Sequence, residues 1–189
     1  EDSYIKYFTS KDWVTFSLNL LGDCGEIGKF QYAPLIGPDI LSGILVNTTG
    51  RSVFDFATEY LFTPLGIEVK DKITFSSEEE QVAFLKAKDI NGWVIDSCGI
   101  NAAGWGLTLS TRAMAKIGQL YLNQGRWNKQ QIVSKQWVID SIKKQSYNDE
   151  LNLAYGYLWW LHQDGFMAMG DGGNVIYVNI MKKIVISIT

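Results

Sequence analysis

Five segments of the first 144 residues carry apolar side chains every three to four positions, a spacing that predicts amphipathic helices. Ser stands at the start of most of these segments, where its hydroxyl can accept a hydrogen bond from the first helical turn. Glycine or proline follows several of them and favours a helix end. The five predicted helices cover residues 10–21, 38–49, 52–63, 111–123 and 134–144.

The pattern changes after Asn152, where aromatic and β-branched residues fill short stretches separated by Asp-Gly and Gly-Gly turns. This composition is typical of antiparallel strands. Between the two regions, residues 68–90 are polar and charged, and we interpret them as solvated surface structure. Helices followed by a three-stranded antiparallel meander predict an α+β fold, which we expect to form a single domain over residues 1–189. The predicted strands cover residues 155–162, 166–169, 174–180 and 183–189.

The composition is that of a globular protein, with 47% apolar and 13% aromatic residues, including seven tryptophans. The net charge is −3, and no block of Lys or Arg occurs, which argues against nucleic acid or an anionic membrane surface as a partner. The longest apolar runs, such as Leu41 to Val46, are far shorter than the roughly 20 residues that a membrane span requires. We therefore expect no nucleic-acid partner and no membrane span.

The residues that most often bind metals are scarce in this chain. His162 is the only histidine, and no acidic residue stands at ligand spacing from it, so we predict neither a metal site nor a Ser-His-Asp triad there. Cys24 and Cys98 do not follow a metal-binding or redox spacing, and we expect two free thiols. The sequence does not indicate a cellular compartment.

Seven short motifs follow one another along the chain, and none of them is specific alone. In this order and spacing, over residues 28–189, they resemble the later part of the serine β-lactamase-like hydrolases, which include class C β-lactamases, DD-peptidases and related esterases. The resemblance implies part of a β-lactamase/transpeptidase-like fold. The motifs are Phe30-Gln-Tyr32, Thr49-Gly-Arg-Ser52, residues 56–67, Gly104-Trp-Gly-Leu-Thr-Leu-Ser110, residues 114–123, Tyr155-Gly-Tyr-Leu-Trp-Trp160 and Gly170-Asp-Gly-Gly173.

In that family the serine of a Ser-x-x-Lys motif attacks the substrate, a tyrosine shuttles its proton, and a strand with Lys-Thr-Gly or a similar sequence holds the substrate. The resemblance places the tyrosine at Tyr32, and it implies neither a cofactor nor a metal. A Gly-rich strand allows close approach of a substrate, although it equally indicates a tight turn. The implied substrate-binding residues are Trp105, Met169, Gly170, Asp171, Gly172, Gly173 and Asn174.

Three departures from the family pattern weaken the prediction of activity. Pro34 stands two residues after Tyr32, where the family has Asn or a small polar residue. Neither Lys nor His occurs in Met169–Asn174, and Asp171 adds a negative charge that repels substrate carboxylates. Tyr32 is also open to the ordinary interpretation of a structural aromatic residue, and Trp105 to that of a buried tryptophan between glycines.

Two motifs in the later half have the spacing of catalytic motifs but the wrong place in the chain. Ser141-Ile-Lys-Lys144 contains a Ser-x-x-Lys, and Ser146-Tyr-Asn148 resembles the Ser-x-Asn form of the second motif. Both lie downstream of Tyr32, whereas the family has its Ser-x-x-Lys well upstream. We interpret Ser141 and Lys144 as part of a solvated helix end.

The resemblance leads to three hypotheses. The first is a serine hydrolase acting on an amide, ester or peptide bond through an acyl-enzyme, with its nucleophile motif outside this chain, so that the chain alone is inactive. The second is a non-catalytic scaffold that binds a peptide or partner subunit. The third is a structural fragment. By comparison with the family, both ends of the domain are incomplete, and an N-terminal segment or a partner chain is expected to cover an open sheet edge.

Overall fold

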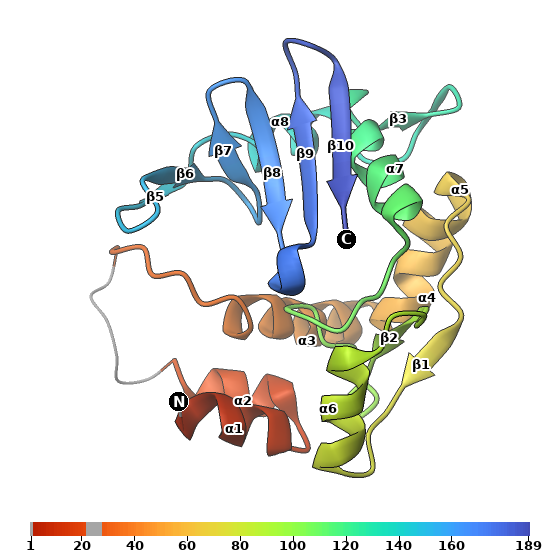
Figure 1. The fold of residues 1–189 in the computed structure, drawn as a ribbon, viewed down its shortest axis with the longest axis vertical. Helices are drawn as coiled ribbons and strands as arrows, with labels where there is room; N and C mark the ends of the chain where they lie inside the picture. The colour runs from red at the N-terminus through yellow and green to blue at the C-terminus, as the bar shows by residue number, and fades with distance from the viewer. Residues whose placement is uncertain (1, 22–27) are drawn as a thin grey trace. The chain divides into compact units, whose positions relative to one another are not determined.

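The computed structural model describes residues 2–21 and 28–189 (Figure 1). The described chain groups into two compact units. The first unit comprises residues 1–27, 33–59 and 68–108, and the second comprises residues 28–32, 60–67 and 109–189. The single-domain organisation stays a prediction, and each unit is described by itself.

The first unit is mainly helical, with one small parallel sheet. Strands β1 (Asp71–Ile73) and β2 (Gly92–Val94) pair in parallel, with Lys72 opposite Trp93. Aromatic rings dominate the core of this unit, where Tyr7, Trp13 and Val94 are buried. The helices of the first unit are α1 (Asp2–Thr9), α2 (Trp13–Asn19), α3 (Ile36–Thr49), α4 (Val53–Ala57) and α6 (Glu78–Lys86).

The second unit is built on a six-stranded antiparallel sheet in the order β10-β9-β8-β7-β6-β5 (Figure 1). Helix α7 (Thr111–Leu122) packs on β9 and β10, and its side chains meet the buried Trp159, Phe166 and Val178. Helix α8 (Lys135–Ser141) and a short hairpin, β3 (Arg126–Trp127) and β4 (Gln130–Gln131), precede the sheet. The strands are β5 (Ser146–Asn148), β6 (Leu153–Tyr155), β7 (Trp160–His162), β8 (Gly165–Met169), β9 (Val175–Asn179) and β10 (Ile184–Ile188).

The α+β class is confirmed, but the sheet has six strands where a three-stranded meander was predicted. The predicted strand over residues 155–162 is divided between β6 and β7, which are joined by a tight turn in which Leu158 has a φ of +64°. Strand β5 adds three more residues. Strands this short carry too few positions for an alternating pattern to be recognised.

Helix starts were predicted better than helix ends. The predicted caps Ser52, Ser110 and Ser134 each accept a backbone N–H of the first turn, at 3.0, 3.2 and 3.1 Å. Gly50, with a φ of +66°, ends α3 as predicted. Pro64 does not end the next helix: a π-helical turn (Thr58–Phe62) leads into α5 (Thr63–Leu65), where Pro64 stands in the first turn.

Two further helix boundaries differ from the prediction. Helix α2 begins at Trp13, because Asp12 rather than Ser10 caps it, through a 2.8 Å hydrogen bond from the Thr15 amide. Helix α8 ends at Ser141, three residues before the predicted end.

Residues 68–90 contain more regular structure than the interpretation as solvated surface suggested. Helix α6 lies there, capped by Ser77, and its first turn holds Glu78, Glu79 and Glu80. Most of its side chains are exposed, as expected. The missed signal was the capping serine before three acidic residues, which favours a helix start through the helix dipole.

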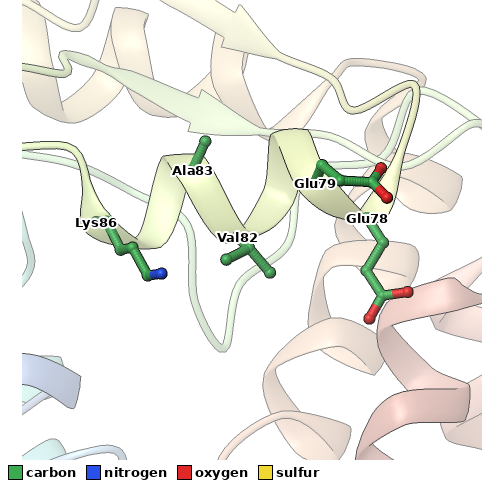
Figure 2. Close-up of a pocket in the computed structure, with 5 residues that line it drawn as sticks. All are labelled: Glu78, Glu79, Val82, Ala83 and Lys86. Atoms are coloured by element: carbon green, nitrogen blue, oxygen red, sulfur yellow. The ribbon is translucent and has the colours of Figure 1, made fainter.

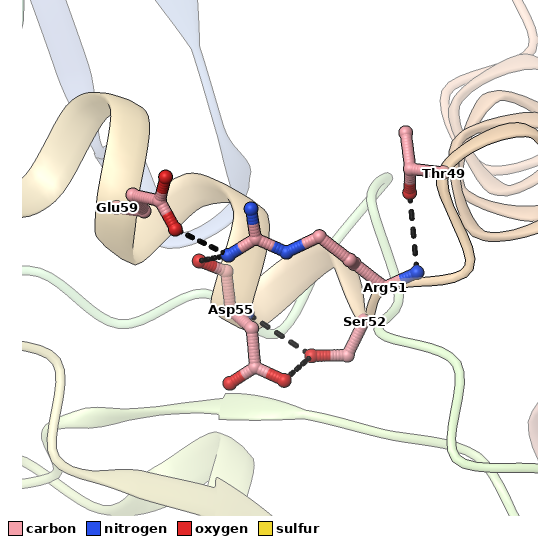
Figure 3. A network of polar contacts seen from close by, with 5 residues as sticks. All are labelled: Thr49, Arg51, Ser52, Asp55 and Glu59. Carbon is pink, nitrogen blue, oxygen red and sulfur yellow. Dashed lines mark hydrogen bonds and ion pairs between the residues drawn. The ribbon is translucent and has the colours of Figure 1, made fainter.

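A polar network joins α3 to α4 (Figure 3). Arg51 forms an ion pair with Glu59 at 2.7 Å, and its backbone N–H donates to the Thr49 hydroxyl at 3.2 Å. The Ser52 hydroxyl donates to the Asp55 carboxylate at 2.5 Å while it accepts the Asp55 amide. These contacts fix the turn at Gly50, so that α4 starts in a defined direction.

No helix in the described part of the chain has both the length and the apolar character that crossing a bilayer demands.

Candidate functional site

Tyr32 lies in the second unit, in the extended segment before α3, and its ring contacts the aromatic side chains of β6 and β7. The centroid of its ring is 5.0 Å from that of Trp160 and 5.9 Å from that of Tyr155. Phe30 adds a further contact with Tyr155, at 5.4 Å between centroids. Tyr32 keeps 39% of its surface exposed, whereas Trp160 is buried. One side of the Tyr32 ring is therefore held by the sheet while another part faces solvent.

The aromatic group around Tyr32 shields the hydroxyl of Tyr155 from water. Burial raises the pKa of Tyr155 to about 12, and the neighbouring Tyr32 adds to that rise. Aromatic rings replace water without supplying positive charge, so they disfavour the ionised form of a buried phenol. Tyr155 is therefore a poor candidate for a base.

The predicted substrate strand is the end of β8 and the turn that follows it. Residues Asp171–Gly173 form a single 3-10 turn, closed by a 2.8 Å hydrogen bond from the Gly170 N–H to the Asn174 carbonyl. The Asn174 amide donates to the Asp171 carbonyl at 2.5 Å. The turn requires glycine at Gly172 and Gly173, whose φ angles are +73° and +85°. A tight turn is thus present, and the whole stretch is exposed.

The sheet register places Met169 on the same face as the aromatic group. Trp160 lies directly opposite Met167 in the β7–β8 ladder, and Met169 follows two residues later. Because side chains alternate along a strand, Met167 and Met169 share the face of Trp160 and Tyr32. The structure therefore brings the candidate tyrosine and the start of the Gly-rich turn to one face of the second unit.

Trp105 belongs to the first unit, where it is half-buried and packs against the aromatic core. Its ring lies 5.1 Å from that of Phe8, 5.4 Å from Trp13 and 6.2 Å from Phe75, measured between centroids. Its indole N–H donates to the Tyr7 hydroxyl at 3.0 Å. Its role in substrate binding stays a prediction.

A buried carboxylate holds the loop of Trp105 in place. Asp39 is 1% exposed and accepts the hydroxyl of Tyr7 together with the N–H groups of Ala103, at 2.9 Å, and Gly104, at 3.4 Å. Desolvation raises the pKa of Asp39, although its three hydrogen bonds oppose that rise. Burial and the bond to Asp39 likewise raise the pKa of Tyr7. An acid in the first turn of a helix is expected from the helix dipole alone, so the sequence does not reveal this role.

The two motifs of the later half that have catalytic spacing, Ser141–Lys144 and Ser146–Asn148, have structural roles. The Ser141 hydroxyl is buried and donates to the Val138 carbonyl of its own helix at 3.0 Å. The Lys144 ammonium lies over the ring of Tyr147, 4.9 Å from its centroid. Asn148 accepts the Leu151 amide at 2.8 Å within the β5–β6 turn. No serine–lysine pair forms there. The interpretation as a solvated helix end was wrong for Ser141, which is 1% exposed, and Lys144 lies beyond the end of α8.

A second Ser-x-x-Lys spacing joins Ser3 to Lys6. Both residues lie on α1, one turn apart. The side chain of Ser3 lies outside the described part of the structure, so its reactivity is a matter for the labelling experiment below. Cys24 also lies outside the described residues, while Cys98 is a free, exposed thiol.

Among the described residues, the one group that could hold a metal ion is Asp12, Asp96 and Cys98, whose ligand atoms lie within 4.8 Å of one another. Both carboxylates already accept hydrogen bonds from other groups of the protein. Asp12 accepts the amide and hydroxyl of Thr15, and Asp96 accepts the amides of Cys98, Ile100 and Trp13. Capping and turn formation account for this cluster. His162, exposed at the end of β7, is not part of it.

Two hollows lie in the first unit. One, of about 570 Å³, runs along an exposed side of α6 and is lined by Glu78, Glu79, Val82, Ala83 and Lys86 (Figure 2). The other, of about 450 Å³, lies between α2 and α3. Neither includes Tyr32 or the β8–β9 turn, and the first offers no nucleophile, so neither supplies the chemistry that the sequence predicted.

No family model matches the chain. Among solved structures, it is similar to a protein from Bacillus anthracis described as a "putative 6-aminohexanoate-dimer hydrolase", with a TM-score of 0.65 and 23% sequence identity. The likeness covers 87% of this chain but only 39% of that chain, so this chain spans well under half of the similar protein's length. The chain therefore has an α+β fold that corresponds to part of a β-lactamase-like fold.

Proposed function

We propose that this chain is part of a serine hydrolase that cleaves an amide, ester or peptide bond through an acyl-enzyme. The observation that carries the proposal is the likeness in fold to the described hydrolase, over 87% of this chain. The placement of Tyr32 and Met169 on one face of the second unit supports it. Under this proposal Tyr32 is the proton shuttle, and the β8–β9 turn holds the substrate.

The chemistry requires a partner that these residues do not supply. A serine hydroxyl is a weak nucleophile until a base takes its proton, and a tyrosine acts as that base only when a cation stabilises its phenolate. In this proposal the ammonium of a Ser-x-x-Lys motif supplies that cation. In this proposal that motif lies outside the chain, and the 189 residues alone are inactive.

Asp171 sets the charge preference of the proposed site. It is exposed in the turn, and Met169–Asn174 contains no Lys or Arg to neutralise it. A substrate with an ammonium group near this turn is favoured over one with a carboxylate there. The similar structure is described as a 6-aminohexanoate-dimer hydrolase, so linear amides bearing both groups are the first substrates to test. We expect Asp171→Asn to improve kcat/KM for carboxylate-bearing amides by about threefold to tenfold, since the charge is exposed and partly screened.

Covalent labelling tests the proposal. The 189-residue chain and the longest product of the same reading frame are treated with a fluorophosphonate and with a chromogenic β-lactam, and the labelled serine is located by mass spectrometry. We expect labelling only in the longer product, at a serine outside residues 1–189. Labelling of the shorter chain would contradict the proposal that it lacks a nucleophile, and Ser3→Ala and Ser141→Ala would then identify the serine.

The role of Tyr32 is tested by Tyr32→Phe in an active product. Loss of a general base lowers kcat by roughly 10²- to 10⁴-fold, while the phenyl ring keeps the contacts with Trp160 and Tyr155. The matched control is Tyr157→Phe, which removes a phenol from an exposed ring and should leave kcat unchanged. Equal activity of the two variants would exclude Tyr32 as the base.

The alternative function is a non-catalytic scaffold that binds a peptide or a partner subunit. Pro34 and the acidic, cation-free turn at Asp171 favour it, because both differ from what acyl transfer needs. Absence of labelling in every product, together with unchanged folding, would support this alternative over the hydrolase.

A further inference from the structure

Three pairs of neighbouring residues in this chain join an asparagine or an aspartate to a following glycine. They are Asn91-Gly92, Asp164-Gly165 and Asp171-Gly172. In such pairs the backbone nitrogen of the glycine can attack the side-chain carbonyl carbon of the preceding residue, because glycine has no Cβ that hinders the approach. The attack requires the connecting peptide to rotate, so the fold decides which pair reacts.

Asn91-Gly92 is held at both reacting groups. The Asn91 side-chain amide donates to the Glu68 carbonyl at 2.9 Å, and its oxygen accepts the Lys70 N–H at 3.1 Å. The attacking nitrogen is engaged as well, since the N–H of the buried Gly92 donates to the Thr108 hydroxyl at 2.8 Å. This pair is therefore protected in the folded chain.

Asp164-Gly165 is held by the six-stranded sheet. Gly165 pairs with Asn179 of β9, and a Cβ added to it would lie 1.8 Å from the Val178 carbonyl oxygen. The Asp164 carbonyl accepts the Ile180 N–H at 2.9 Å. Rotation of this peptide would break the ladder between β8 and β9, so this pair reacts only when the sheet opens locally.

Asp171-Gly172 lies in the exposed turn between β8 and β9, where the restraints are weaker. Among the described residues, the nearest atom to a Cβ built on Gly172 is the Asn174 side-chain nitrogen, at 3.7 Å. Gly172 is the second residue of a 3-10 turn, where the N–H finds no acceptor within the turn because bonds there span three residues. A bond from an exposed side chain restrains the peptide: the Asn174 amide donates to the Asp171 carbonyl at 2.5 Å.

We propose that Asp171 is a site of spontaneous isomerisation to isoaspartate. The Gly172 nitrogen bonds to the side-chain carbonyl carbon of Asp171 and loses its proton, and one carboxyl oxygen leaves as water. The cyclic succinimide that results then takes up one water. Its opening at the side-chain carbonyl restores aspartate, whereas its opening at the main-chain carbonyl gives isoaspartate. The mass of the chain is unchanged, and nothing is oxidised or reduced.

Isomerisation changes the shape and the charge placement of the turn. The Cβ of Asp171 enters the main chain, which becomes one carbon longer, and the carboxylate moves to the α-carbon. A turn that joins two paired strands at Met169 and Val175 has to deform to accept this extra atom. Under the proposed function, on which this consequence alone rests, the modified turn holds the substrate less well, and kcat/KM falls as the protein ages.

The experiment incubates the folded 189-residue chain at neutral pH in heavy-oxygen water over several weeks. An isoaspartate-specific carboxyl methyltransferase with labelled S-adenosylmethionine detects the modified residue, and peptide mapping by mass spectrometry locates it through its heavy oxygen. We expect isoaspartate to form at Asp171 at least about tenfold faster than at Asp164, which reacts only through local opening. In urea the two rates should converge, because both pairs then have the same chemistry.

Three variants separate this chemistry from other changes in the turn. Asp171→Glu keeps the charge but would require a larger ring, so it should abolish labelling of the turn. Asp164→Glu is the matched control and should leave that labelling unchanged. Asn174→Ala releases the Asp171 carbonyl and should raise the rate by about twofold to tenfold, the equivalent of one lost hydrogen bond.

Equal rates at Asp171 and Asp164 in the folded chain, absence of isoaspartate at Asp171, or labelling of the turn that survives Asp171→Glu would each overturn the proposal. An active longer product that accumulates isoaspartate at Asp171 without loss of kcat/KM would support the modification site. The same result would contradict the role of the turn in substrate binding, so the two proposals fail separately.

Discussion

Replacement of Asp39 by alanine tests the buried network that organises the first unit. The carboxylate of Asp39 accepts hydrogen bonds from the Tyr7 hydroxyl and from the amides of Ala103 and Gly104. It thereby ties α1 and the loop of Trp105 to α3. Asp39→Ala removes both acceptor oxygens at once. The Tyr7 hydroxyl then has no acceptor for its proton, although its oxygen still accepts the Trp105 indole N–H, and the Ala103 amide loses its acceptor as well.

The magnitude follows from the burial of the groups left unsatisfied. A buried donor that loses its acceptor costs about 1–3 kcal/mol, which applies in full to the Tyr7 hydroxyl, whereas the amide of the exposed Ala103 can bond water and costs less. Relief from burying a carboxylate offsets part of this loss, since desolvation outweighs the hydrogen bonds in setting the pKa of Asp39. We expect a net loss of about 2 kcal/mol, a large share of the roughly 5–15 kcal/mol that stabilises a typical domain.

Urea unfolding followed by tryptophan fluorescence measures this loss, because Trp105 and Trp13 lie beside the network. Asp39→Asn is the matched control: its carbonyl still accepts the Ala103 amide, and its amide can donate to the Tyr7 oxygen. The loss with Asp39→Asn should therefore be smaller, about 1 kcal/mol. A loss below about 1 kcal/mol for Asp39→Ala, or an equal loss for both variants, would refute the assignment.

The same residue predicts a direction for pH dependence. The pKa of Asp39 is raised in the folded state, so the folded chain binds its proton more tightly than the unfolded chain does. Its contribution to the free energy of unfolding is present below the pKa of the unfolded state, about 4. This contribution is lost as the pH rises through the pKa of the folded state. Asp39→Asn should flatten this fall, and an unchanged slope would contradict it. Asp96, whose pKa burial also raises, keeps part of the slope in the variant.

Five further substitutions test local features by their effect on the free energy of unfolding. Leu158→Gly should stabilise the chain by about 1 kcal/mol, since a left-handed φ of +64° strains leucine but not glycine, and a loss would show that the side chain contributes more than the strain costs. Ser17→Ala should be neutral or stabilising because the buried Ser17 hydroxyl has no hydrogen-bond partner. Ser52→Ala should cost about 1 kcal/mol through loss of a helix cap. A larger loss of stability for Ser17→Ala than for Ser52→Ala would contradict this reasoning. Gly118→Ala should be destabilising, because its Cβ would lie 2.6 Å from a side chain of the sheet. Gly37→Ala on α3 is the control, because nothing lies within 4 Å of its Cβ, and the free energy of unfolding of both variants is measured by calorimetry.

Local signals in the sequence determined the helix starts and the fold class. A capping hydroxyl acts on the turn that immediately follows it, so Ser52, Ser110 and Ser134 could be identified without knowledge of the fold. Gly50 could be identified for the same reason, because a left-handed helix end needs only its own residue type. The order of the motifs predicted the family fold, and the similar structure confirms that fold over most of the chain.

The tertiary structure alone decided the pairing of short strands and the roles of the candidate site residues. Strands β1 and β2 pair across about twenty residues, and nothing in three-residue strands indicates such a partner. Trp105 packs against the core because Tyr7, Phe8 and Phe75 lie beside it, although all lie far away in the sequence. Burial of Asp39 depends on the same distant residues. Such facts are set by long-range packing, which residue type and local spacing do not encode.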